Sequence, residues 1–267
     1  MKNYLNFIVL CVFLLSTSLT AQNKLKGNKE VTSNNRHLSD FTKIEIIDNV
    51  DVLLVYNKNQ SVTVETDSNL QNAIDTQVND GILTISTNSK IIRKKKLIIH
   101  IKVNEGIEEI FAYNNANVKS KNILVIDSIT INAFDNSDFD LKLNSKIAHI
   151  NSKKTSNLKL AILGQESVIR AEESSDITAT IDNENTLIYT LDKASVSLEG
   201  NTEYLEIESL GNSAFKGKDF IAINALVNAT NNTDVYVQST KNIDIYAKNS
   251  AKVYIYSNPK ITLSEFF

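Results

Sequence analysis

The feature that most constrains this chain is a repeat of about 19 residues that begins near residue 107 and continues almost to the last residue. Each repeat carries a small residue, then any residue, then an apolar one. The pairs are Ala116/Val118, Ser137/Phe139, Ser156/Leu158, Ser175/Ile177, Ala194/Val196, Ser213/Phe215, Thr233/Val235 and Ala251/Val253. Successive small residues are 21, 19, 19, 19, 19, 20 and 18 positions apart. Such regular spacing is typical of stacked structural units.

A β-branched aliphatic residue precedes each small residue by six positions. These residues are Ile110, Ile131, Ile150, Ile169, Ile188, Ile207, Val227 and Ile245. One repeat has too few apolar residues for a core of its own, so stacked coils must share one. The pattern predicts an all-β fold, a single-stranded parallel β-helix (β-solenoid) with about eight coils of ~19 residues. The alternative, an antiparallel sandwich, gives no reason for eight registers to stay in phase.

The remaining segments divide the chain further. Residues 1–21 read as a signal peptide, because Lys2 precedes an apolar run from Leu5 to Leu15 and a small-residue exit at Ala21. A membrane anchor is the alternative, but the run is short for the ~20 residues of a spanning helix. We expect a flexible leader over 22–39, an N-terminal β-region of irregular first coils or a cap over 40–106, regular repeats over 107–258, and a C-terminal cap over 259–267. The protein is then exported, to the periplasm, cell surface or exterior.

Composition excludes several classes of chemistry. Cys11 is the only cysteine and lies inside the signal peptide, so the mature chain has no disulfide, cysteine-ligated zinc or cysteine nucleophile. The formal net charge of −3 argues against nucleic acid or an anionic membrane as partner, since both require a concentrated basic field.

The sequence resembles a known family, the putative auto-transporter adhesins with a head GIN domain, over about Phe41 to Pro259. The resemblance lies in Phe41-x-x-Ile44 leading into Val50-Asp-Val-x-Leu54, in the strand and turn from Val78 to Ile85, and in the serial small-x-aliphatic repeats. Family repeats usually carry Gly before the small residue, where this chain has Asn, Ser, Thr or Lys. The resemblance implies an exported bacterial β-helix, and it supplies no catalytic residues.

No constellation for catalysis, a cofactor or a metal emerges from the sequence. His37, His100 and His149 are far apart and read as isolated surface histidines, because a zinc site needs converging ligands. The run from Asp135 to Asp140 resembles part of a calcium loop but lacks the Gly and distal Glu that such a loop needs. It therefore reads as a solvated turn.

Outward positions supply the candidate binding residues. The residue five positions before each small corner forms a mixed polar and aromatic ladder, and we take from it a candidate binding surface. Its members are Asn132, Asn151, Arg170, Tyr189, Glu208 and Tyr246. Tyr236, Tyr254 and Tyr256 share another outward face, as a partner patch or as stacking that supports the ladder. The cluster Arg93–Lys96 reads as a solvated loop or as a contact for an anionic glycan.

These features together predict a non-enzymatic, adhesin-like or envelope binding module that contacts a cell-surface glycan or an envelope protein through its outward ladders. One alternative is a carbohydrate-active enzyme, a polysaccharide lyase or hydrolase, on the same scaffold. The ladders show no recurring pair of acids, which such hydrolysis requires. A second alternative is a purely structural envelope protein.

Overall fold

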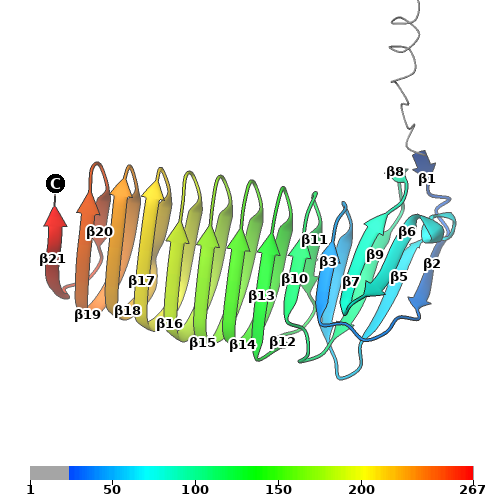
Figure 1. Cartoon of the computed structure of the whole chain (residues 1–267), viewed down its shortest axis with the longest axis horizontal. Coiled ribbons are helices and arrows are strands. Elements are labelled where there is room, and N and C mark those ends of the chain that lie inside the picture. Colours follow the sequence, from blue (N-terminus) through cyan, green and yellow to red (C-terminus); the bar gives the residue numbers. More distant parts are fainter. Residues whose placement is uncertain (1–23, 267) are drawn as a thin grey trace, which may run out of the picture.

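The computed structural model describes residues 24–266, so the expected signal peptide lies outside the described residues. These residues form an elongated two-layered stack of β-strands (Figure 1). The regular part is a parallel β-solenoid of about eight turns, about 19 residues apart. Its strands are β10 (Glu109–Ala112), β11 (Asn117–Ser120), β12 (Leu124–Val125), β13 (Ser128–Ala133), β14 (Asp138–Ser152), β15 (Asn157–Ala171), β16 (Asp176–Thr190), β17 (Ser195–Gly211), β18 (Ala214–Asn231), β19 (Asp234–Lys248), β20 (Lys252–Ile255) and β21 (Lys260–Phe266). The predicted fold class is confirmed.

Each long strand contributes to both layers, because it bends near its middle. In β15, Leu158, Leu160 and Ile162 point inward before the bend, and Ile169 and Ala171 point inward after it. We call the outward side of the first halves the leading face and the outward side of the second halves the trailing face. Parallel pairing keeps equivalent residues of successive coils in line, as for Ile150, Ile169 and Ile188.

The predicted aliphatic ladder is the centre of the core. Each of its eight members has at most 2% of its surface exposed. Seven of the eight small corner residues are also buried, and Ala251 in the last coil is half-buried. Stacking equivalent side chains in this way gives one continuous apolar core, which is what a solenoid needs because no single coil can form a core alone.

The chain turns between the layers at a left-handed residue two positions before each small residue. These residues have φ between 51° and 82° and are Asn114, Asp135, Lys154, Glu173, Asp192, Gly211, Asn231 and Asn249. In the coil of β16, the N–H of Ser175 donates to the carbonyl of Glu172 and closes a β-turn whose first central residue is Glu173. Asn, Ser, Thr or Lys stands immediately before the small residue, and that position takes positive φ only at Asn115. In every coil the residue one position further upstream takes positive φ, which the repeat alone does not show.

The bend inside each strand has a different chemistry, which the repeat did not reveal. Buried polar side chains at the bend satisfy nearby backbone carbonyls: Ser145 Oγ donates to Ile147 O (2.8 Å) and Thr202 Oγ1 to Tyr204 O (3.1 Å). Gly164 occupies this bend in β15, where a Cβ would lie 1.8 Å from the carbonyl oxygen of Ser145. These contacts fix the bend, because unpaired polar groups are costly in the core.

The N-terminal strands continue the stack and close its end (Figure 1). The elements are β1 (Lys24–Lys26), β2 (Val31–Arg36), β3 (Lys43–Ile46), β4 (Asp51–Tyr56), β5 (Ser61–Asp67), the 3-10 helix η1 (Ser68–Ala73), β6 (Ile74–Asn79), β7 (Ile82–Thr87), β8 (Lys90–Arg93) and β9 (Leu97–Val103). Parallel pairing links β7 to β3 to β10, and β9 to β4 to β11. Antiparallel pairs, β2 with β5, β5 with β9 and β6 with β7, then cover the end.

The expectation of a flexible leader over 22–39 is wrong for most of that segment. Residues 24–26 pair in parallel with β8, and residues 31–36 pair in antiparallel with β5. The segment is polar and aperiodic because β2 is an outermost strand, whose side chains are mostly exposed. Long-range pairing, rather than apolar alternation, therefore orders it.

The C-terminal residues extend the stack. Strand β21 pairs in parallel with β19, and its Ile261 and Leu263 align with the buried Ile243 and Ile245. Ile261 and Leu263 are nevertheless 49% and 58% exposed, because no other strand of residues 24–266 covers them. The cap expected over 259–267 is thus a further strand across its described residues, and Phe267 lies outside them. Within residues 24–266, no helix has the length and apolar character needed to cross a bilayer.

Candidate binding surfaces

The structure brings the six predicted ladder residues into one line along the trailing face. Backbone pairing aligns Asn132, Asn151, Arg170, Tyr189 and Glu208 in successive coils. Asn228 then separates Glu208 from Tyr246. The alignment of the first five residues follows directly from their constant spacing of 19, and the spacings of 20 and 18 on either side of Asn228 compensate each other.

Neighbouring members of this ladder bind one another. Asn151 Nδ2 donates to Asn132 Oδ1 (2.9 Å), and the guanidinium carbon of Arg170 lies 4.7 Å from the ring centroid of Tyr189. Asn132 is buried, whereas Arg170 and Glu208 are exposed. The exposed part of the ladder therefore offers a cation, an anion and an aromatic ring over adjacent coils, at a strand spacing of about 4.8 Å.

A second surface lies on the leading face near the C-terminal end, where three tyrosines form what we call the tyrosine shelf. Tyr236 in β19 stacks on Tyr254 in β20, with centroids 4.6 Å apart and planes 10° apart. Tyr256 tilts against Tyr236 at 6.3 Å. Tyr254 and Tyr256 are 40% and 41% exposed, so two ring faces or edges remain available to a partner.

A cavity of about 370 Å³ opens beside the tyrosine shelf. Its lining residues are Thr178, Ser197, Leu198, Glu199, Lys216, Lys218, Asp219, Tyr236 and Tyr256. The lining thus combines one apolar floor with hydroxyls, two cations and two carboxylates. Lys216 Nζ donates to Ser195 Oγ (3.2 Å), which holds that cation along the cavity rim.

A bulge in β18 creates the cavity. The pairing of β18 with β17 shifts between Ser197 and Glu199, and its pairing with β19 shifts between Gly217 and Ile221. Phe220 is fully buried, and the added residues push Lys218 and Asp219 outward. The sequence signal was the change in repeat spacing to 20 and then 18 at these coils. Bulges of this kind commonly redirect side chains next to functional sites.

The hydroxyl of Tyr236, a residue that lines the cavity, stays protonated at neutral pH. Loss of solvation raises the pKa of Tyr236 above its ordinary value, and the charge of Asp234 and the neighbouring tyrosines add to this shift. A protonated phenol both donates and accepts hydrogen bonds. The shelf therefore joins aromatic surface to a hydroxyl that can bind other hydroxyls.

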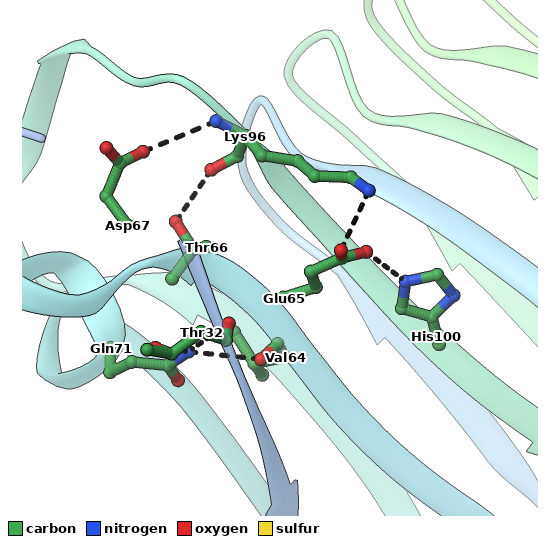
Figure 2. Close-up of polar contacts among 8 residues, drawn as sticks. All are labelled: Thr32, Val64, Glu65, Thr66, Asp67, Gln71, Lys96 and His100. Atoms are coloured by element: carbon green, nitrogen blue, oxygen red, sulfur yellow. Dashed lines mark hydrogen bonds and ion pairs between the residues drawn. The ribbon is translucent and has the colours of Figure 1, made fainter. Parts of the chain in front are cut away.

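A polar network at the N-terminal end involves one of the three histidines (Figure 2). Glu65 accepts a hydrogen bond from Lys96 Nζ (2.8 Å) and lies 2.8 Å from His100 Nε2. The hydrogen bond from Lys96, and then that from His100, lower the pKa of Glu65. The interpretation of His100 as isolated is therefore wrong, because the antiparallel pairing of β5 with β9 brings it to Glu65.

Asp67 supports a different part of the same network. Its buried carboxylate accepts backbone N–H groups of Lys29, Lys95 (2.7 Å) and Lys96 (3.3 Å). Burial alone would raise the pKa of Asp67, but these donors outweigh burial and hold the pKa below its ordinary value. The carboxylate thus joins the turn after β1 to the turn after β8, and its role is structural.

Metal-binding groups do not gather in the part of the chain that the structure covers. No three His, Asp or Glu side chains among residues 24–266 are arranged to hold an ion. Asp138 and Asp140 are exposed and outward, as expected, and Asp135 pairs with Lys154. Asp135 is the left-handed turn residue of its coil, which accounts for the resemblance of this run to part of a calcium loop.

Comparison with known proteins agrees with this architecture. A putative adhesin from Parabacteroides distasonis ATCC 8503 superposes with a TM-score of 0.55 at 20% identity, covering 90% of this chain and 100% of that one. A putative lipid binding protein from the same organism superposes with a TM-score of 0.59 at 16% identity, covering 90% and 95%. At these identities the likeness concerns the fold. No curated protein matches the chain. The family profile for "Putative auto-transporter adhesin, head GIN domain" matches residues 40–259, and the chain belongs to that family.

Proposed function

We propose that this protein is a non-enzymatic, adhesin-like binding module that holds a cell-surface glycan on the tyrosine shelf. The observation that carries the proposal is the stacked pair Tyr236–Tyr254 beside the cavity at the β18 bulge. Membership of an adhesin family supports a binding role. The sequence of residues 1–21 supports export to the periplasm, the cell surface or the exterior.

The chemistry of the site favours a neutral sugar. Aromatic faces carry partial negative charge, and the C–H groups on one side of a pyranose ring carry the complementary partial positive charge. Lys216 and Lys218 oppose Glu199 and Asp219 around the cavity, so no single ligand charge is selected. Donors and acceptors in balance suit the many hydroxyls of a neutral glycan.

The exposed ladder on the trailing face is the second contact surface in this proposal. Arg170, Tyr189 and Glu208 repeat at strand spacing, and a partner that lies along the rod would meet them in turn. An envelope protein would be a suitable partner there, because stacked Arg and Tyr side chains are common anchors of protein interfaces.

Glycan array binding followed by titration of two variants tests the proposal. Tyr254→Ala removes an exposed shelf ring, and we expect roughly tenfold weaker binding to the neutral glycan that the wild type selects. Tyr189→Ala changes the same residue type on the other face and serves as the matched control. Loss of glycan binding in Tyr189→Ala alone would move the site to the ladder. Absence of glycan binding by the wild type would contradict the proposal.

Glycoside hydrolysis is the competing function, and one feature favours it. Glu199 and Asp219 pair across adjacent strands and line the same cavity. Two nearby carboxylates are what a glycosidase needs. Release of reducing ends from the bound glycan, abolished by Asp219→Asn, would establish hydrolysis and end the non-enzymatic interpretation.

A further inference from the structure

The small sheet of β1 and β8 carries like charges side by side. Lys24 pairs with Lys90, and Lys26 pairs with Arg93, while Leu25 and Ile91 pair between them. Like charges directly opposite each other on neighbouring strands are destabilising. Lys94 and Lys95 follow at once, so we call this group of six cations the basic arm: Lys24, Lys26, Lys90, Arg93, Lys94 and Lys95.

The basic arm has little acidic compensation. Its six side chains are exposed, and no carboxylate among the described residues forms an ion pair with any of them. Asp48 is the one acid in the lining of the adjoining cavity, and it already accepts the amide and hydroxyl of Thr87. Asp67 is buried and binds backbone N–H groups, not the side chains of the arm. The small negative charge of the whole chain argued against an anionic membrane as partner, but it conceals a concentrated basic field at one end of the rod.

A cavity and an apolar tip complete the surface. The cavity of about 470 Å³ is lined by Lys90, Arg93 and Lys94 together with Ser89 and Ile92, among others. The side chain of Ile92 is 46% exposed. It lies where the pairing of β1 with β8 shifts register, so the irregularity presents an apolar group among the cations.

Hydrogen bonds within the adjoining turns hold the basic arm in place. Gly27 N donates to Arg93 O (2.8 Å), which ties the end of β1 to the end of β8. Asp67 accepts backbone N–H groups from both turns, and a Cβ on Gly27 would lie 2.6 Å from its Cγ. The backbone that carries these cations is therefore fixed at the ends of both strands.

We propose that the basic arm docks on an anionic phospholipid surface. Positive charge without internal partners is complementary to lipid phosphates, and each cation close to such a surface adds to the affinity. Ile92 favours this partner over an acidic polysaccharide. Transfer of its exposed aliphatic side chain out of water would strengthen binding to a bilayer, whereas a hydrated polysaccharide offers no such apolar region. The cavity lined by Lys90, Arg93 and Lys94 gives a headgroup phosphate a recess with three cations.

Flotation of residues 22–267, which contain every described residue, with phospholipid vesicles tests the proposal. We expect binding to phosphatidylglycerol–phosphatidylcholine vesicles, none to phosphatidylcholine alone, and a steep loss with added salt. Lys90→Glu with Arg93→Glu should weaken binding by at least about 25-fold, because one cation near an anionic surface contributes about fivefold. These substitutions place Glu opposite Lys24 and Lys26, so they favour folding of the sheet.

The matched control is Lys142→Glu with Lys159→Glu, which makes the same charge change in the middle of the rod. It should retain most of the binding. Ile92→Asn should weaken binding by several fold with no change in net charge. Equal vesicle binding by the wild type and the Lys90/Arg93 variant would overturn the proposal. So would full displacement by a soluble uronic-acid polysaccharide together with an unchanged Ile92→Asn, which would identify an acidic glycan as the partner.

Discussion

Single residues set the shape of each coil in this solenoid, most clearly at the two places where the chain changes direction. The turn between layers requires positive φ, which costs a side chain with a Cβ roughly 1 kcal/mol more than glycine. Asn and Asp tolerate this conformation best. Lys154 and Glu173 occupy it with long side chains, so these two coils hold local strain that their neighbours avoid.

Glu173→Gly should therefore raise the melting temperature. The gain is about 0.5–1 kcal/mol, because relief of the left-handed strain exceeds the added entropy of the unfolded chain. Thermal unfolding followed by circular dichroism measures it. Thr155→Gly is the control, since that residue has no positive φ and glycine there should only destabilise. A lower melting temperature for Glu173→Gly would contradict this account.

Gly164→Ala should have the opposite effect at the bend. Its new Cβ would lie 1.8 Å from the carbonyl oxygen of Ser145 in the preceding coil, so backbone must shift and a ladder hydrogen bond must weaken. We expect a loss of about 2–3 kcal/mol in the free energy of unfolding. Gly106→Ala, which meets only the half-buried side chain of Asn104 at 3.2 Å, should change little. Urea titration of both variants decides the comparison.

At the scale of elements, the N-terminal end depends on one carboxylate. Asp67 has a lowered pKa in the folded protein, so its ionised form stabilises the fold above its unfolded pKa of about 3.9. That stabilisation is lost as the pH falls through the lower, folded pKa. We expect amide exchange at residues 27–29 and 94–96 to accelerate below about pH 4 before exchange in β14 to β17 changes.

Asp67→Asn should cause the same local opening at neutral pH. An amide offers one acceptor oxygen to three N–H groups and adds donors of its own. Amide exchange resolved by segment measures the effect. Asp80→Asn is the matched control, because Asp80 lies in an exposed turn with positive φ that Asn also tolerates. Equal protection of residues 94–96 in both variants would show that Asp67 does not hold the arm.

Some elements could be predicted from the sequence and others could not, for physical reasons. Ile188 and its equivalents repeat at a fixed spacing because each coil must place an aliphatic residue in the shared core. The same spacing places Arg170 next to Tyr189 on adjacent coils, so the ladder and this contact could be predicted from the sequence. In the sequence, the bulge at Asp219 is visible only as a change in the spacing of the repeat. Strand β1 gave no signal, because the residues that order Lys24–Lys26 lie in β8 and its alternation is too short to indicate a strand.

At the scale of the whole molecule, stability is shared among neighbouring coils. Ile188→Asp would place a charge in the common core and should unfold several coils around β16, as would Ile169→Asp in β15. Thr178→Asp, which points outward from β16, should leave the melting curve nearly unchanged. Circular dichroism with limited proteolysis separates the two cases. Native β-signal and native melting in Ile188→Asp would contradict the proposed sharing.

The exposed core positions of β21 have a consequence for how long such a rod can be. Ile261 and Leu263 present core positions to the outside, and a further unit with the same period could continue from them without rearranging anything before it. Length is therefore a modular property of this scaffold, adjustable in steps of about 4.8 Å. Adding or removing one coil would change the distance between the two ends of the rod by about 4.8 Å. The binding residues at each end would stay the same.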